Sequence, residues 1–147
     1  RPHTGAACVK INAMDADAGR DMHSAIEQVI PVQPNTLYTF SAYAKMPTNQ
    51  SGWAQLFVGG DRPDGKLMPS SFVVMPYLDE EWHRLYLTVR TEDKQYRLRV
   101  SCVMVGNGLI YFDDMMAIPG TIPTDVPELM SMDVYYKEKN GRLARLP

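Results

Sequence analysis

The sequence lacks the features that mark membrane proteins, nucleic-acid-binding proteins and metal-binding cysteine proteins. No apolar run approaches the roughly 20 residues that cross a bilayer. There is no long basic run, and the net charge is −2. These absences argue against membrane insertion and against a nucleic-acid partner. The spacing of Cys8 and Cys102 fits neither a zinc site nor a CxxC pair. Each is expected inside a strand, as a buried free thiol or, if the two strands meet, as half of a disulfide.

Signatures of catalysis are missing as well. The chain has no serine nucleophile elbow, no HExxH motif and no phosphate-binding loop. Its three histidines are scattered, and neither the acidic run 79–81 nor the pair Asp113 and Asp114 shows the opposed acid and base of a glycosidase. We therefore predict that the chain is not an enzyme.

What the chain does have is a two-residue alternation of apolar and polar side chains. In the segment 36–46, Phe40, Ala42 and Ala44 alternate with Ser41 and Tyr43, as in a strand with one buried face. No segment has the period of an amphipathic helix. Turns rich in Gly, Pro, Asn and Asp separate the strands, which indicates an all-β antiparallel sandwich or barrel. The predicted strands are 6–11, 23–31, 36–46, 53–58, 71–75, 82–90, 95–103 and 109–117.

The length of 147 residues fits one domain and a short tail. After residue 118 the segment PGTIPTDVPELM contains three prolines, which cannot donate to a β-ladder. We predict a sandwich over residues 1–118 and a Pro-rich linker or extended arm over 119–147. Within this arm the segment 133–137 is a candidate for one more strand, and the arm as a whole could contact another protein subunit. Because the sequence begins at Arg1 without a Met, we expect a processed product or a piece of a longer polypeptide.

Three blocks of the sequence resemble the galactose-binding-like carbohydrate-binding modules. They are the apolar run followed by PNTLYTFSAYAK in 28–45, the segment EWHR leading to Thr88 and Thr91, and the closing strand IYFDDM in 110–115. The resemblance spans roughly residues 6–117 and implies a jelly-roll sandwich that binds a glycan. The family usually opens with a further strand that ends in an acidic residue, and no such strand precedes the first one here.

The resemblance also implies a structural calcium ion, with Asp113 or Asp114 as a ligand. Calcium takes six to eight oxygens, so carboxylates from the loop 12–21, namely Asp15, Asp17 or Asp21, would have to contribute. As neighbours on a strand, Asp113 and Asp114 are expected to point to opposite faces. The alternative is that Asp114 caps local backbone amides and Asp113 is solvated.

A sugar site needs aromatic rings for the C–H faces of the sugar and planar polar groups for its hydroxyls. Outward-facing aromatic, Gln and Arg side chains of the predicted strands supply both. Trp53 is the leading candidate, followed by Tyr43 and Tyr86. The alternative is structural: Trp53 packs under the loop 59–69, and the arginines pair with acidic side chains across strands. The candidate glycan-binding residues are Tyr43, Trp53, Gln55, Phe57, Arg84, Tyr86, Arg97 and Arg99.

These observations favour a non-catalytic module that binds a glycan or cell-surface polysaccharide within a larger extracellular or secreted polypeptide. The step from sandwich to sugar is an analogy with the family. The alternative function is a structural or assembly domain on a particle surface, such as a virus particle or a phage tail. In that case the C-terminal arm would add a strand to a neighbouring subunit.

Overall fold

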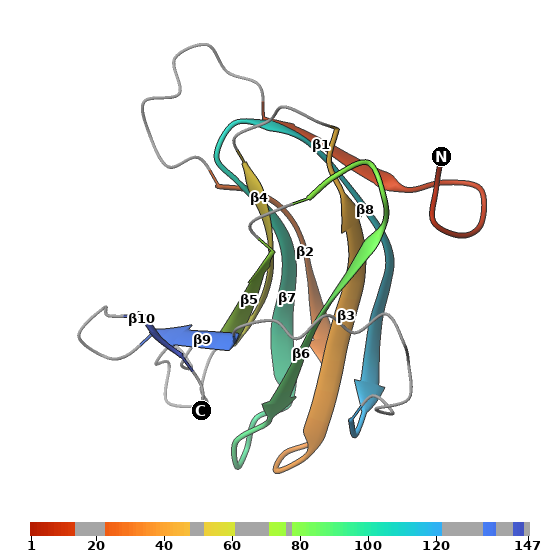
Figure 1. The fold of residues 1–147 in the computed structure, drawn as a ribbon. Helices are drawn as coiled ribbons and strands as arrows, with labels where there is room; N and C mark the ends of the chain where they lie inside the picture. The colour runs from red at the N-terminus through yellow and green to blue at the C-terminus, as the bar shows by residue number, and fades with distance from the viewer. Residues whose placement is uncertain are drawn as a thin grey trace.

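A computed structural model of the chain describes residues 1–13, 23–47, 52–60, 71–75 and 78–121, and the strand backbones 134–137 and 143–145. This described part is all β, with no helix (Figure 1). No helix there is long and apolar enough to span a membrane. The strands are β1 (Val9–Ala13), β2 (His23–Pro31), β3 (Leu37–Lys45), β4 (Trp53–Gly59), β5 (Ser71–Met75), β6 (His83–Arg90), β7 (Arg97–Val105), β8 (Gly108–Pro119), β9 (Val134–Lys137) and β10 (Leu143–Arg145).

The strands form two sheets that pack face to face. The first sheet has the order β1-β8-β3-β6, and the second has the order β10-β9-β5-β4-β7-β2. Every pairing is antiparallel. The predicted antiparallel sandwich is therefore confirmed. Most neighbours within a sheet are distant in sequence, as in a jelly roll, so each face collects residues from separate parts of the chain.

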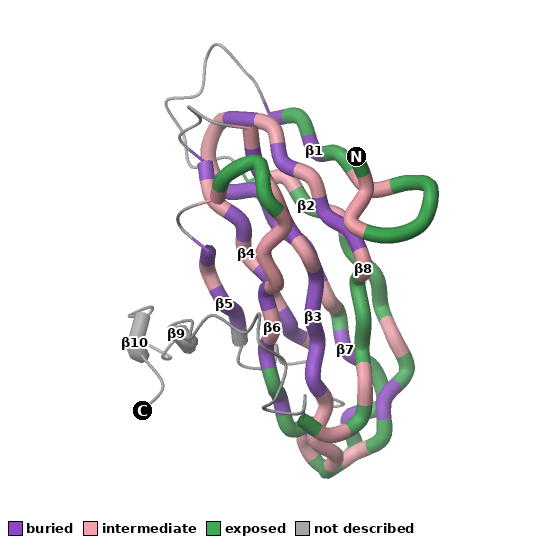
Figure 2. The backbone as a smooth tube through the Cα atoms, turned by 45° about the vertical axis from the view of Figure 1, so that its right-hand side comes forward, coloured by how far each residue is buried: buried purple, intermediate pink, exposed green. Residues whose placement is uncertain are grey.

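The core lies between the two sheets and follows from the alternation of the sequence. In β3, Phe40 and Ala44 are fully buried, and Figure 2 shows β3 buried along most of its length. Phe112 of β8 lies on the same sheet, and Leu56 and Met104 come from the facing sheet. Because inward residues of each strand are apolar, burying that face is the main force that holds the two sheets together.

Two predictions at the strand ends were wrong. The first strand begins at Val9, so Cys8 precedes it. Tyr96 falls within the predicted strand 95–103, but it lies before β7 and is 62% exposed. Both cysteines are free, Cys8 half-buried and Cys102 buried in the core. Burial raises the pKa of the Cys102 thiol to about 12, because the thiolate would lose its hydration.

A β-bulge in β8 overturns the expectation that Asp113 and Asp114 point to opposite faces. Ser41 pairs with Met116, whereas Tyr43 pairs with Asp113, so β8 has one extra residue in this interval. Asp114 takes it up in the left-handed region, with φ of +45°. Such a bulge breaks the two-residue alternation, and both carboxylates receive hydrogen bonds from the same N-terminal segment.

The segment expected as an arm contributes two strands. β9 pairs with β5 at the edge of the second sheet, and β10 pairs with β9. β9 lies in the segment 133–137 that was a candidate for an additional strand. The division between a domain 1–118 and an arm 119–147 stays a prediction.

Candidate functional site

The eight candidate glycan-binding residues lie on two different surfaces of the sandwich. Within each strand, these residues alternate with the buried ones. However, the strands belong to different sheets. The outer side of the first sheet carries Tyr43, Arg84 and Tyr86, and that of the second sheet carries Trp53, Gln55, Phe57, Arg97 and Arg99.

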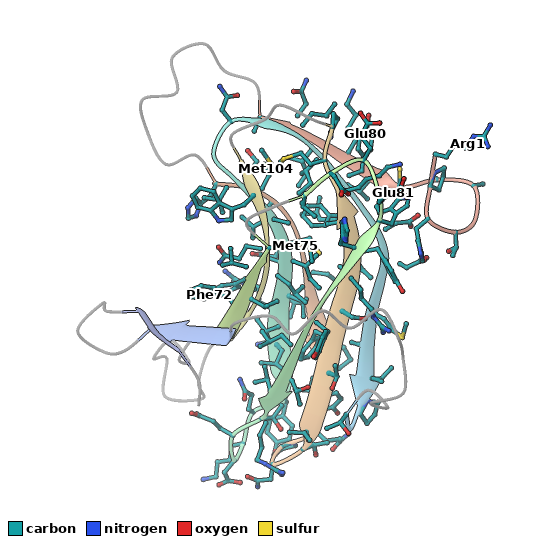
Figure 3. All side chains as sticks on the ribbon, in the orientation of Figure 1. Arg1, Phe72, Met75, Glu80, Glu81 and Met104 are labelled. Carbon is teal, nitrogen blue, oxygen red and sulfur yellow. The ribbon has the colours of Figure 1, made fainter. Side chains whose placement is uncertain are left out.

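The outer surface of the second sheet is here called the Trp53 face. Its part over β4 and β5 is aromatic and apolar. Trp53, Gln55 and Phe57 follow one another along β4, each half-buried. Phe57 pairs with Phe72 on β5, whose side chain is 9% exposed and adds little open ring surface. Figure 3 shows Phe72 directed away from the first sheet, while Met75 of the same strand is directed toward it. Val74 on β5 and Val103 on β7 pair with Gln55 from its two neighbouring strands.

The other side of the Trp53 face is polar. Ser101 pairs with Phe57 on one side and with Glu27 on the other. The Ser101 hydroxyl donates to Glu27 Oε2 at 3.0 Å, and Arg99 Nε lies 3.3 Å from Glu27 Oε1. Both charged side chains are about half-exposed, so the ion pair is screened and easily exchanged. The described structure gives the amide of Gln55 no hydrogen-bond partner.

Sequence reasoning missed Glu27, Phe72 and Ser101 on this face. In the segment 71–75, Phe72 alternates with the inward Val73 and Met75. The alternation alone therefore predicts that Phe72 lies on the outer face of the sheet. The pairing of β2 with β7 places Glu27 beside Ser101, and no signal within either strand predicts that pairing.

Residues 1–4 cover the outer side of the first sheet around Tyr43. The His3 ring is stacked on Tyr43, with ring centroids 3.7 Å apart and planes 17° apart. The His3 amide donates to Asp113 Oδ2 at 2.7 Å, and the His3 ring Nδ1 donates to Asp114 Oδ2 at 2.6 Å. Thr4 adds its amide to Asp113 and its hydroxyl to Asp114. Tyr43 is thus in contact with a neighbouring ring.

Around this stack lie further aromatic and cationic groups. Lys45 Nζ lies 4.7 Å from the ring centroid of Trp82, whose edge also meets the His3 ring. The Arg84 guanidinium lies 5.8 Å from the Tyr43 ring centroid, and its Nη2 donates to Ser41 Oγ at 3.2 Å. Trp82 is half-buried on this outer side.

The predicted calcium ligands Asp113 and Asp114 already accept hydrogen bonds from the chain. The pKa of Asp114 lies below its ordinary value of 3.8, because the His3 ring and then the Thr4 hydroxyl stabilise the carboxylate. The described residues contain no group of three or more His, Cys, Asp or Glu that could hold a metal ion. The calcium site stays a prediction, because its six to eight oxygens were expected to include carboxylates of the loop 12–21. Asp15, Asp17 and Asp21 lie outside the described residues, so their part in the prediction is untested.

Solved structures that share this fold include the following three. One is a family 4 carbohydrate-binding module, 19% identical over 65% of this chain and 61% of its own, with a TM-score of 0.50. Another is a family 16 carbohydrate-binding module, 15% identical over 79% of both chains, with a TM-score of 0.58. The third is an arabinose-bound α-L-arabinofuranosidase, 16% identical, with a TM-score of 0.57. Its match covers 78% of this chain and 20% of the enzyme.

The chain has the jelly-roll fold of carbohydrate-binding modules. The resemblance noted in the sequence is confirmed for the fold, and at these identities the comparison extends no further than the fold. The match spans less than two thirds of the family 4 module's length. No protein-family model matches the sequence, and no curated protein matches it either.

Proposed function

We propose that this chain is a non-catalytic carbohydrate-binding module whose glycan lies across the Trp53 face. The observation that carries the proposal is that five of the eight candidate residues come together there. Trp53 and Phe57 contribute ring surface beside the amide of Gln55 and the charged pair of Arg99 and Glu27. The fold shared with the family 4 and family 16 modules supports this choice among the functions that a sandwich can perform.

The chemistry of the face matches a sugar chain better than a compact ligand. A strip of half-buried rings on a sheet surface offers flat area for successive C–H faces, and the amide and the ion pair beside it offer both donors and acceptors. The Tyr43 surface is the poorer choice, because His3 already occupies the ring. Tyr43, Arg84 and Tyr86 are therefore not assigned to the glycan site.

The test is a titration of the 147-residue chain with a panel of soluble oligosaccharides, followed by calorimetry or NMR. Trp53→Ala should weaken binding by about 30-fold, because an aromatic anchor at a binding hot spot is worth about 2 kcal/mol or more. Tyr96→Ala is the control, since it removes an aromatic ring that is 62% exposed and lies outside β4. Tyr96→Ala should bind like the parent chain.

A chain that binds no glycan at millimolar concentration, or a Trp53→Ala variant that binds as tightly as Tyr96→Ala, would overturn the proposal. Thermal unfolding of each variant shows whether the loss of binding is a loss of fold.

We further propose that the module belongs to a larger extracellular or secreted polypeptide. Support comes from the arabinofuranosidase, in which this fold makes up a fifth of the chain. The use of the same sandwich for assembly, with the C-terminal segment against another subunit, is the competing proposal. Size-exclusion chromatography with light scattering separates them, because assembly through this chain predicts a concentration-dependent oligomer.

A further inference from the structure

Residues 1–4 lie on the outer side of the first sheet without being part of it. Among the described residues, no backbone–backbone hydrogen bond outside the strands involves residues 1–8. Side chains of the sheet hold the segment instead: Lys45 Nζ donates to the Arg1 carbonyl at 3.1 Å, and Asp113 and Asp114 accept from His3 and Thr4. Figure 3 shows Arg1 on this side of the molecule, opposite to Phe72.

This manner of attachment is that of a bound ligand. The His3 ring is stacked on Tyr43 and donates to Asp114, and the His3 backbone amide donates to Asp113. Asp113 is only 9% exposed, so its carboxylate needs hydrogen-bond donors from some source. Residues 4–7 are exposed and form no ladder, which makes this part of the chain one of the easiest to open.

An open hollow of about 430 Å³ is lined by His3 and Thr4 of the segment together with Tyr43, Arg84 and Asp114 of the sheet. Arg84 Nε is the one buried side-chain nitrogen or oxygen of the described residues with no hydrogen-bond partner. The surface under the segment therefore combines a ring, two carboxylate acceptors and a guanidinium whose donors are not all used. We call these residues, Tyr43, Arg84, Asp113 and Asp114, the covered platform.

We propose that the covered platform is a second carbohydrate-binding site, and that residues 1–4 occupy it as an internal ligand which a sugar displaces. The choice of ligand class rests on the function proposed above. A sugar ring would place its C–H face on Tyr43, where the His3 ring now lies. Its hydroxyls would donate to Asp113 and Asp114 in place of His3 and Thr4, and its oxygens would accept from Arg84.

The segment lowers the apparent affinity of this site by competition. A ligand tethered a few residues away has an effective concentration in the millimolar range. Apparent affinity falls by the fraction of molecules in which the platform is open. If the platform is open in about a tenth of the molecules, releasing the segment strengthens binding about 10-fold.

The test compares the parent chain with His3→Ala, using the oligosaccharides that bind the Trp53 face. His3→Ala removes the stacked ring and leaves every residue of the covered platform in place. We expect a second equivalent of sugar to bind about 10-fold more tightly than in the parent chain. Adding Tyr43→Ala to His3→Ala should abolish this gain, whereas adding Trp53→Ala should leave it. His83→Ala is the control for loss of a histidine, because His83 pairs with Asp79 instead.

Thr4→Ala provides an independent variant, since it removes only a hydroxyl donor to Asp114 from an exposed residue. It should produce the same gain as His3→Ala, though smaller. If both variants keep the stoichiometry and affinity of the parent chain while Trp53-dependent binding is intact, the covered platform is refuted and the proposed function stands. If binding depends on Tyr43 and not on Trp53, the platform stands and the assignment of the Trp53 face fails.

Discussion

Single side chains in the core and on the surface of β8 should differ sharply in their importance for stability. Phe112 is fully buried between the sheets, and Met115 on the same strand is 51% exposed. Phe112→Ala should lower the free energy of unfolding by about 3–5 kcal/mol, the cost of a large core cavity. Met115→Ala, the control, should change it by less than about 0.5 kcal/mol. Urea unfolding followed by tryptophan fluorescence measures both, and equal losses would contradict the described core.

The attachment of residues 1–4 should depend on pH through Asp114. The folded-state pKa of this carboxyl is lowered by the His3 ring and the Thr4 hydroxyl. The stabilisation of the attached segment by the Asp114 carboxylate is therefore fully present when the pH is above the ordinary pKa of 3.8. It is lost as the pH falls through the lower folded-state pKa. NMR of the carboxyl carbon should give a midpoint below 3.8 in the parent chain. In His3→Ala the midpoint should move upward, and an unchanged midpoint would show that His3 is not the cause.

At the scale of elements, the turn between β6 and β7 holds a residue in an unfavourable conformation. Lys94 has a φ of +59°, in the left-handed region that costs an L-residue with a side chain about 1–2 kcal/mol. Lys94→Gly should raise the free energy of unfolding by about 0.5–1 kcal/mol, after the entropy of the added glycine is subtracted. Asp93→Gly, one residue earlier and without a positive φ, should lower it. Thermal and urea unfolding of the two variants would contradict this account if both changed stability in the same direction.

The strands themselves could be predicted from sequence, because the alternation of inward and outward side chains (here called parity) is a local property of each segment. Residues such as Phe40 and Ala42 alternate with Ser41 and Tyr43 in the printed sequence, and the sandwich buries one set. Parity does not say which sheet a strand joins. Tyr43 and Trp53 share an outward parity and lie on opposite sides of the molecule, because β3 and β4 belong to different sheets. The candidate glycan-binding residues therefore divide between two surfaces, which the alternation within each strand does not predict.

The β-bulge in β8 is a second feature that could not be predicted from the sequence. The sequence FDDM suggests a regular strand, and only the register of β8 against β3 shows that Asp114 is an inserted residue. The consequence is large, since the bulge brings both carboxylates to the N-terminal segment. No local signal in the sequence indicates the role of His3, because its partners lie 110 and 111 residues away.

For the whole molecule, the two thiols should report on the integrity of the sandwich. Cys102 is 2% exposed with a pKa raised to about 12, so in the folded state it is neither accessible nor ionised. Cys8 is half-buried, outside the strands. A bulky disulfide reagent should therefore label one thiol per folded chain rapidly, and the second only when the two sheets separate.

The labelling rate of Cys102 should rise with urea concentration in parallel with global unfolding, because the two sheets must separate before the reagent reaches this thiol on β7. Cys8→Ser is the control: it should abolish the rapid phase and leave the slow one. Two rapid thiols would mean that the sheets open locally at β7 in the native state. No reactive thiol in the unfolded chain without a reductant would mean that Cys8 and Cys102 form a disulfide, and that the N-terminal segment crosses to the second sheet.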